Sequence, residues 1–262
     1  MASEPNRPLL VDSHCHIPLI KADPATVIAA AHANGVEHML CVSVELESFP
    51  AVLALAEQYD CVYASVGVHP NATIAEEPNA DHLAKLAVHP KVVAIGETGL
   101  DYFRSQGDLE WQRQRFRTHI RAARMARKPL IIHSRDARAD VLAILKEEGA
   151  DQVGGVMHCF VDDWESARCA MDLGFYISFS GIVTFKNAAS LQEVARQMPS
   201  ARLLVETDSP YLAPVPFRGK ENQPAYVRHV AECIAALRGE SFADVTRATT
   251  DNFFNLFPAK KS

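Results

Sequence analysis

The feature that most constrains the fold is a regular alternation of short apolar runs and longer helical patterns along the chain. Eight of these runs have the length and residue types of buried strands. They are Leu9–Asp12, Val36–Val42, Val62–Val68, Val92–Glu97, Leu130–His133, Gly154–His158, Tyr176–Ser180 and Leu203–Thr207. Strands that alternate with helices are typical of a parallel sheet covered by helices.

Helical patterns fall between and after these runs. The first has Asp23 as a candidate N-cap, Pro24 in its first turn and Gly35 after its end, residue types that are common at helix termini. The predicted helices are Pro24–Asn34, Phe49–Tyr59, Ala80–Val88, Leu109–Lys128, Ala137–Glu148, Trp164–Leu173, Ala188–Met198, Tyr226–Leu237 and Phe242–Phe257.

This pattern predicts an α/β fold, a (β/α)8 TIM barrel. A chain of 262 residues suits one such barrel, and we expect residues 1–262 to form a single domain. The competing architecture is a doubly wound open sheet. That fold would carry a Gly-rich fingerprint after its first strand, where this chain has Asp-Ser-His-Cys-His instead.

Charge and composition narrow the classes of function. The formal net charge of -6 argues against a globally basic protein that coats nucleic acid, although a local basic groove remains compatible with it. No apolar run approaches the ~18 residues that a membrane helix needs, and Met1 to Pro8 resembles no signal peptide. The six cysteines form no Cys-x-x-Cys pair, so we expect reduced thiols and a cytoplasmic protein, with no membrane and no obligate protein partner.

The first strand ends in two histidines that are spaced to act together. In an extended backbone, side chains two residues apart point the same way, so His14 and His16 would lie side by side and could hold one divalent metal. A lone His-x-His is weak evidence, because two ordinary histidines would look the same. Cys15 should point the other way and pack in the core.

Further metal-ligand types recur where later strands should end. They are His69, Glu97, His133, His158, Glu206 and Asp208. Each has an ordinary interpretation alone, for example a buried imidazole or a helix cap. In a barrel, however, active residues lie at the carboxyl ends of the strands, which is where this set falls.

Six stretches resemble the TatD family of metal-dependent hydrolases, within the amidohydrolase-like barrels. They are Val11–His16, Gly67–Pro70, Ile95–Tyr102, Pro129–Ala137, Met157–Phe160 and Leu204–Leu212. They span nearly the whole chain in the expected order. Many members carry Asp or Asn two residues after the second histidine of the first motif, where this chain has Ile17-Pro18, which bears on the shape of that loop.

The resemblance implies a centre of two divalent metal ions, with zinc, manganese and magnesium as candidates. His14, His16, Glu97 and Asp208 would hold one ion, and Glu97, His133 and His158 the other. Glu97 would bridge them, since two close cations need a shared anion. Glu97 and Asp208 would be the catalytic residues, with Asp208 as the base that takes or orients the proton of a metal-activated water.

The function that the resemblance implies is cleavage of phosphodiester bonds in nucleic acid, as in a TatD-type deoxyribonuclease that trims DNA ends. The alternative is a metal-dependent ester or amide hydrolase, such as an aminoacyl-tRNA deacylase. A third hypothesis is a scaffold that binds metal or nucleic acid without catalysis. The complete ligand set with open coordination positions argues against it.

Four residues are candidate substrate contacts, and each has an alternative. Arg135 either binds phosphate or forms an ion pair with Glu206. His69 and Tyr102 either contact the scissile phosphate or sugar or pack within loops. Arg218, together with Lys220 and Phe217, either meets nucleic acid at the mouth or belongs to a well-shaped surface loop.

A basic stripe on the fourth predicted helix is a weaker candidate. It comprises Arg113, Arg117, Arg121, Arg124 and Lys128. We interpret it as an ordinary solvated face, because on a barrel helix it would lie away from the carboxyl ends of the strands.

Overall fold

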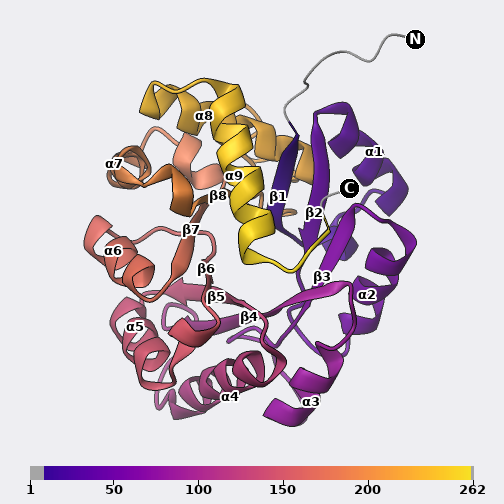
Figure 1. The fold of residues 1–262 in the computed structure, drawn as a ribbon, viewed down its shortest axis with the longest axis vertical. Helices are drawn as coiled ribbons and strands as arrows, with labels where there is room; N and C mark the ends of the chain where they lie inside the picture. Colours follow the sequence, from indigo (N-terminus) through magenta and orange to yellow (C-terminus); the bar gives the residue numbers. More distant parts are fainter. Residues whose placement is uncertain (1–8, 261–262) are drawn as a thin grey trace.

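The computed structural model describes residues 9–260, and over this range the strands form one parallel sheet in chain order. The strands are β1 (Leu10–Cys15), β2 (Val36–Cys41), β3 (Val62–Val66), β4 (Val92–Asp101), β5 (Leu130–Arg135), β6 (Gly155–Met157), β7 (Phe175–Phe179) and β8 (Leu203–Val205). The helices lie outside the strands, so the predicted (β/α)8 barrel is confirmed (Figure 1). The expectation for Met1 to Pro8 lies outside the described residues.

Every predicted helix is present. The helices are α1 (Pro24–Ala33), α2 (Phe49–Gln58), α3 (Ala80–Leu86), α4 (Glu110–Ala126), α5 (Arg138–Glu147), α6 (Trp164–Asp172), α7 (Ala189–Gln197), α8 (Val227–Arg238) and α9 (Phe242–Leu256). Short 3-10 helices are η1 (Ile17–Leu19), η2 (Ala150–Gln152), η3 (Gly181–Thr184), η4 (Ser200–Arg202) and η5 (Pro224–Tyr226). Asp23 caps α1 as predicted, accepting from the backbone N–H of Ala25 at 3.0 Å.

β4 and β5 extend farther than the apolar runs predict. β4 continues past Glu97 because its ladder with β5 continues to the pair Asp101 and Arg135. Gly99 permits the close approach, since a Cβ there would lie 2.0 Å from the carbonyl oxygen of His133. Polar residues beyond Glu97 are therefore held by strand pairing, after a register shift between Ile95 and Thr98, rather than by loops.

The sheet closes between β8 and β1 just beyond their apolar parts. Cys15 and Ser209 form an isolated parallel bridge. The backbone N–H of His16 donates to Ser209 at 2.8 Å, and that of Asp208 donates to His14 at 2.9 Å. This seam places the first histidine motif directly beside Asp208.

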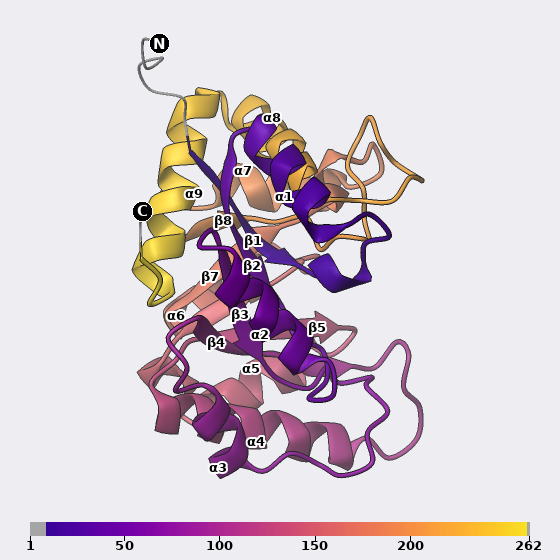
Figure 2. The same ribbon diagram turned by 90° about the vertical axis from the view of Figure 1, so that its right-hand side faces the viewer.

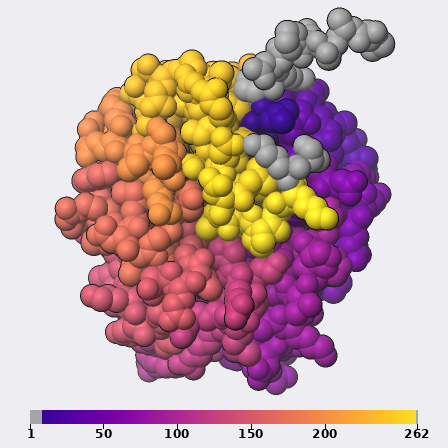
Figure 3. Space-filling view, in the orientation of Figure 1, coloured from indigo at the N-terminus to yellow at the C-terminus, as the bar shows by residue number. Residues whose placement is uncertain are grey.

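One end of the barrel is filled and covered. Residues near the starts of the strands, among them Val11 and Ile131, pack in one cluster with Phe253 and Phe257 at the end of α9. α9 lies across the front of the barrel in Figure 1, and its atoms cover the centre of that face in Figure 3. The loops after β4 and β8 extend together from the other side, where the strands end (Figure 2).

The basic stripe of α4 is tied to the next helix. Arg113 pairs with Asp140 at 3.1 Å, and Arg121 pairs with Glu148 at 3.1 Å. Arg117 contacts both Glu147 and Glu148. These ion pairs join α4 to both ends of α5, and the stripe borders no part of the cavity described below.

Two further sequence expectations concern thiols and membranes. All six cysteines lie within the described residues and are free, as predicted. Cys15 is buried and donates to the carbonyl of Leu40 at 3.4 Å, so it packs in the core. No helix within residues 9–260 has the length and apolar character needed to cross a membrane.

Candidate metal centre

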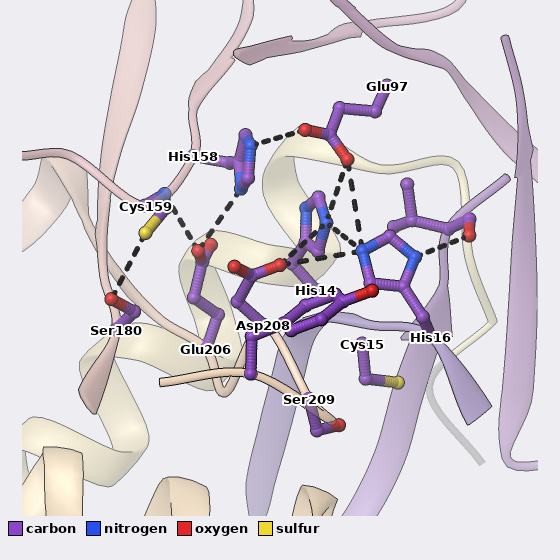
Figure 4. Close-up of polar contacts among 12 residues, drawn as sticks. His14, Cys15, His16, Glu97, His158, Cys159, Ser180, Glu206, Asp208 and Ser209 are labelled. Carbon is purple, nitrogen blue, oxygen red and sulfur yellow. Dashed lines mark hydrogen bonds and ion pairs between the residues drawn. The ribbon is translucent and has the colours of Figure 1, made fainter. Parts of the chain in front are cut away.

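Imidazoles and carboxylates from six strand ends meet around Glu97. The described residues contain three groups whose ligand atoms lie within 4.8 Å of one another. The groups are His14, His16 and Asp208; His14, Glu97 and His158; and His69, Glu97 and His133. Figure 4 shows Glu97 reaching toward His158 on one side and toward His14 and His16 on the other.

The first half of the centre lies at the seam of the barrel. The Nε2 atoms of His14 and His16 are 3.2 Å apart, so the two side chains lie side by side as their spacing predicts. Asp208 Oδ1 is 3.6 Å from His14 Nε2 and 3.4 Å from His16 Nε2. Glu97 Oε2 approaches the same two nitrogens at 3.4 and 3.8 Å.

The second half uses the other oxygen of Glu97. Its Oε1 lies 2.8 Å from His158 Nε2 and 3.0 Å from His133 Nδ1. The two oxygens of one carboxylate therefore face two separate groups of histidines. This is the arrangement that a bridging carboxylate needs.

Three of these histidines have their outer nitrogen bound to an acceptor. His16 Nδ1 lies 2.9 Å from the carbonyl oxygen of Val42, and His158 Nδ1 lies 3.3 Å from Glu206 Oε1. His133 Nε2 lies 3.1 Å from Asp101 Oδ2. We assign these outer nitrogens as N–H donors, so the inner nitrogen of each ring is the one that would coordinate a cation. Such outer acceptors are the usual partners of metal-binding imidazoles.

His69 directs its proton the other way, toward the centre. Its Nδ1 accepts a hydrogen bond from the backbone N–H of Asn71 at 3.0 Å. A neutral imidazole has one donor and one acceptor, so its Nε2 carries the proton and lies 3.4 Å from Glu97 Oε1. His69 is thus arranged to donate a hydrogen bond into the centre rather than to coordinate a cation.

The electrostatics of the cluster keep its carboxylates ionised. Burial by itself would raise the pKa of Glu97, but the imidazoles of His158 and His69 hold that pKa well below its usual range. Burial also acts to raise the pKa of Asp208, but contacts with His16 and His14 outweigh this effect and lower the pKa. Both groups are therefore anionic at neutral pH.

The imidazoles respond to these carboxylates according to their contacts. Burial lowers the pKa of His14, with His158 acting in the same direction. At His16, His133 and His158 burial also acts to lower the pKa, but the neighbouring carboxylates outweigh it and raise the pKa. Burial lowers the pKa of His69 to about 4, so this ring is neutral near pH 7.

Two carboxylates that support the centre, Asp12 and Asp101, were not predicted as site residues. Asp101 binds His133 and also accepts from Asn71 Nδ2 at 2.7 Å. Asp12 accepts from the backbone N–H and the hydroxyl of Thr207 at 2.8 and 2.6 Å. Asp12 and Asp101 belong to the quoted motifs, so a search for carboxylates two or four residues from a proposed ligand would have found them.

The centre forms the floor of a cavity of about 960 Å³. Three of the four candidate substrate contacts, His69, Arg135 and Arg218, line it. The hydroxyl of Tyr102 instead donates to Asp140 at 2.6 Å, and Tyr102 is not among the lining residues, which favours the alternative of loop packing.

The two arginines make no ion pair with a described residue. Arg135 stacks on Phe103 with its guanidinium carbon 3.9 Å from the ring centroid, whereas Glu206 contacts His158 and the backbone of Cys159. Arg135 and Glu206 therefore do not form the ion pair that was the alternative role of Arg135. Phe217 is stacked on Tyr226 with centroids 4.1 Å apart, so that face is not free for a base.

The donor set fits divalent cations. It combines imidazole nitrogens with carboxylate oxygens and no thiolate, a combination that suits zinc, manganese and related ions. The inner nitrogens of His16, His133 and His158 all face the anionic oxygens of Glu97 or Asp208. The chain thus has the residues that a bridged centre of two ions would require.

A match to the model of a known protein family identifies the family of this chain. The model described as TatD related DNase matches residues 11–258. The chain belongs to this family. Among curated relatives of this TatD family member, an uncharacterized metal-dependent hydrolase, YcfH of Escherichia coli K12, is 49% identical over 253 residues, covering 95% of each chain.

Two further comparisons, one with a curated relative and one with a solved structure, agree with this family. The 3'-5' ssDNA/RNA exonuclease TatD of Citrobacter koseri is 33% identical and covers 90% of this chain and 93% of its own. The crystal structure of YJJV, a TatD homolog from Escherichia coli K12, superimposes with a TM-score of 0.87 at 31% identity, covering 96% of this chain and 98% of that one.

Proposed function

We propose that this TatD family member hydrolyses phosphodiester bonds in single-stranded nucleic acid, acting at strand ends in the cytoplasm. The observation that carries this proposal is the charge at the mouth of the cavity. Arg104, Arg135, Arg218 and Lys220 line it, and the side chains of these four make no hydrogen bond or ion pair with any described residue. In a protein of net charge -6, four uncommitted cations around one cavity suit a polyanionic substrate.

The proposed metal ligands are those of the two halves. His14, His16, Glu97 and Asp208 would hold one divalent ion, and Glu97, His133 and His158 the other. When bound, such ions supply Lewis acidity and lower the pKa of water that they contact.

The chain's own residues then have separate tasks. Asp208, anionic and 3.4 Å from His16 Nε2, accepts the proton of the attacking water. The Nε2–H of His69 donates to a phosphoryl oxygen. Arg135, two residues beyond His133 on the same strand, binds the next phosphate of the substrate through its guanidinium edge.

The test compares single-stranded DNA, single-stranded RNA, blunt duplex DNA and charged aminoacyl-tRNA as substrates, with and without a chelator. We expect labelled single strands to be shortened from one end and the chelator to abolish this activity. Release of the amino acid from charged tRNA, with intact oligonucleotides, would replace the proposal with the ester hydrolase alternative.

Replacing the central carboxylate tests the proposed bridge. Glu97→Ala removes an acceptor that faces both groups of histidines, so we expect fewer bound ions per chain and an activity loss of at least about 100-fold. Elemental analysis measures the ions, and Glu57→Ala, on the surface, is the control. An unchanged metal content in Glu97→Ala would contradict the bridging role.

A further inference from the structure

We propose that Phe103, Arg104 and Arg135 form an outer subsite, where a nucleobase of the substrate stacks on Phe103 while the two arginines bind the neighbouring phosphates. This inference rests on the proposed function and extends it to a part of the strand beyond the reacting bond. The outer subsite lies where β4 and β5 end, on the side of the mouth opposite the loop after β8 (Figure 2).

The exposure of Phe103 is the first observation. Its side chain is 59% exposed although it is large and apolar. Arg135 covers part of the ring at 3.9 Å, and Arg135 and Arg104 line the cavity whereas Phe103 does not. A base on Phe103 would therefore lie just outside the cavity, with its phosphate within reach of both guanidinium groups. Aromatic and arginine side chains together are the usual means of binding single strands.

The backbone around Phe103 is held in place. The N–H of Tyr102 donates to the carbonyl of Arg135 at 2.9 Å, and the N–H of Arg104 donates to Asp101 at 2.9 Å. Ser105 donates to Asn71 at 3.0 Å. The exposed ring thus stands between two anchored residues, which lowers the entropy lost when a base stacks on it.

A second pair of an aromatic and an arginine side chain, Trp111 and Arg115, lacks the features that a binding site would need. Trp111 is 41% exposed and lies 4.9 Å from the guanidinium of Arg115. Arg115, however, is fully engaged by Glu77 and by the carbonyls of His69 and Ala72, and neither member lines the cavity. This pair is the matched control for Phe103 and Arg135.

Tyr211 marks the inner position on the other side of the mouth. It lines the cavity, is 54% exposed, and its ring lies 6.5 Å from that of His16. Asn222 Nδ2 holds its carbonyl at 2.6 Å. Tyr211 therefore contacts a nucleotide at the reacting bond, and Phe103 contacts one farther along the strand.

This difference in depth makes the effect of each ring depend on strand length. The experiment measures kcat/KM of the manganese-loaded enzyme for thymidine oligonucleotides from the dinucleotide to the octanucleotide. We expect Phe103→Ala to lower kcat/KM for the octanucleotide by about 5- to 100-fold and to leave the dinucleotide within about twofold. Tyr211→Ala should affect both lengths, and Trp111→Ala neither.

A binding measurement separates this inference from the proposed function. Fluorescence anisotropy with the labelled octanucleotide in a chelator reports binding without cleavage. Arg135→Gln should reduce the slope of log affinity against log salt by about 0.7. Equal losses for Phe103→Ala at both lengths, or no loss at either, would overturn the outer subsite.

If the wild-type enzyme cleaves no oligonucleotide, the proposed function fails and the anisotropy decides the rest. Weaker octanucleotide binding by Phe103→Ala than by Trp111→Ala would still support the outer subsite. Equal binding by the two variants would exclude it.

Discussion

At the scale of single residues, the direction of each imidazole proton determines its use. His16, His133 and His158 each direct an N–H outward to an oxygen acceptor, whereas His69 accepts at its outer nitrogen. Which ring nitrogen can bind a metal is set by the hydrogen bond that the other nitrogen makes. The acceptors Val42, Asp101 and Glu206 therefore matter as much as the histidines themselves.

The carboxylate behind His133 offers a test at this scale. Asp101→Ala removes the acceptor of the His133 Nε2–H and frees the ring to rotate, so we expect metal affinity to fall by about 10- to 100-fold. Competition with a fluorescent chelator measures that affinity. Asp101→Asn keeps an acceptor and should recover part of the loss.

The matched control for Asp101 is Asp140 in α5, which accepts hydrogen bonds from Tyr102 and Arg113. Asp140→Ala should leave metal affinity unchanged. Equal losses of affinity in Asp101→Ala and Asp140→Ala would show that Asp101 acts on folding rather than on His133.

At the scale of elements, α4 supports the end of β3 through a histidine that the sequence left without a role. His119 is fully buried, its Nε2 accepts from the N–H of Val68 at 2.9 Å, and its Nδ1 lies 2.8 Å from the carbonyl of Arg115. The helix thereby holds the loop that carries His69. Because both ring nitrogens are satisfied in the neutral form, protonation must break the contact with Val68.

His119 makes stability depend on pH. Burial lowers its pKa to about 4 from the usual histidine value of 6.5, so the folded chain binds fewer protons than the unfolded chain between these values. The stability from neutral His119 is complete above about pH 6.5 and falls by about 3 kcal/mol as the pH drops to about 4. Urea unfolding in a chelator should show wild type and His119→Gln converging over this window. A pH-independent difference would contradict this assignment.

At the scale of the whole molecule, the hydrogen bonds that close the barrel also bring the residues of the site together. β8 is short, and its continuation, which carries Asp208, is attached to β1 by the hydrogen bonds of Asp12 with Thr207 and of His14 with Asp208. Asp208 itself has a left-handed backbone with φ of 55°, a conformation that Asp tolerates better than most residues. The turn at Asp208 is held between the seam and Asn222, which binds the carbonyls of Thr207 and Tyr211.

A substitution at the seam tests this coupling. Thr207→Val keeps the size of the side chain but removes the hydroxyl that donates to Asp12 at 2.6 Å, leaving a buried carboxylate oxygen without that donor. We expect the free energy of unfolding to fall by about 1–3 kcal/mol, measured by urea titration. Thr246→Val is the control, because the buried Thr246 hydroxyl has no hydrogen-bond partner among residues 9–260. Equal effects of the two substitutions would refute the role of the seam.

The sequence by itself determined the strand and helix order, the barrel, and which residue types stand at the strand ends. These features depend on local periodicity and on the rule that parallel strands finish on one face, so neighbouring residues are enough to reveal them. The side-by-side placement of His14 and His16 followed in the same way from their spacing.

Only the tertiary structure decided which distant residues form hydrogen bonds and contacts with one another. The split of the Glu97 oxygens between two groups, the tautomer of His69, the contact of Tyr102 with Asp140 and the support of His133 by Asp101 all depend on side-chain rotamers and on pairing across strands. No local pattern encodes these, because each depends on which side chains the closed barrel brings within about 3 Å of one another. That the arginines at the mouth form no ion pair with a described residue is likewise visible only in the folded chain.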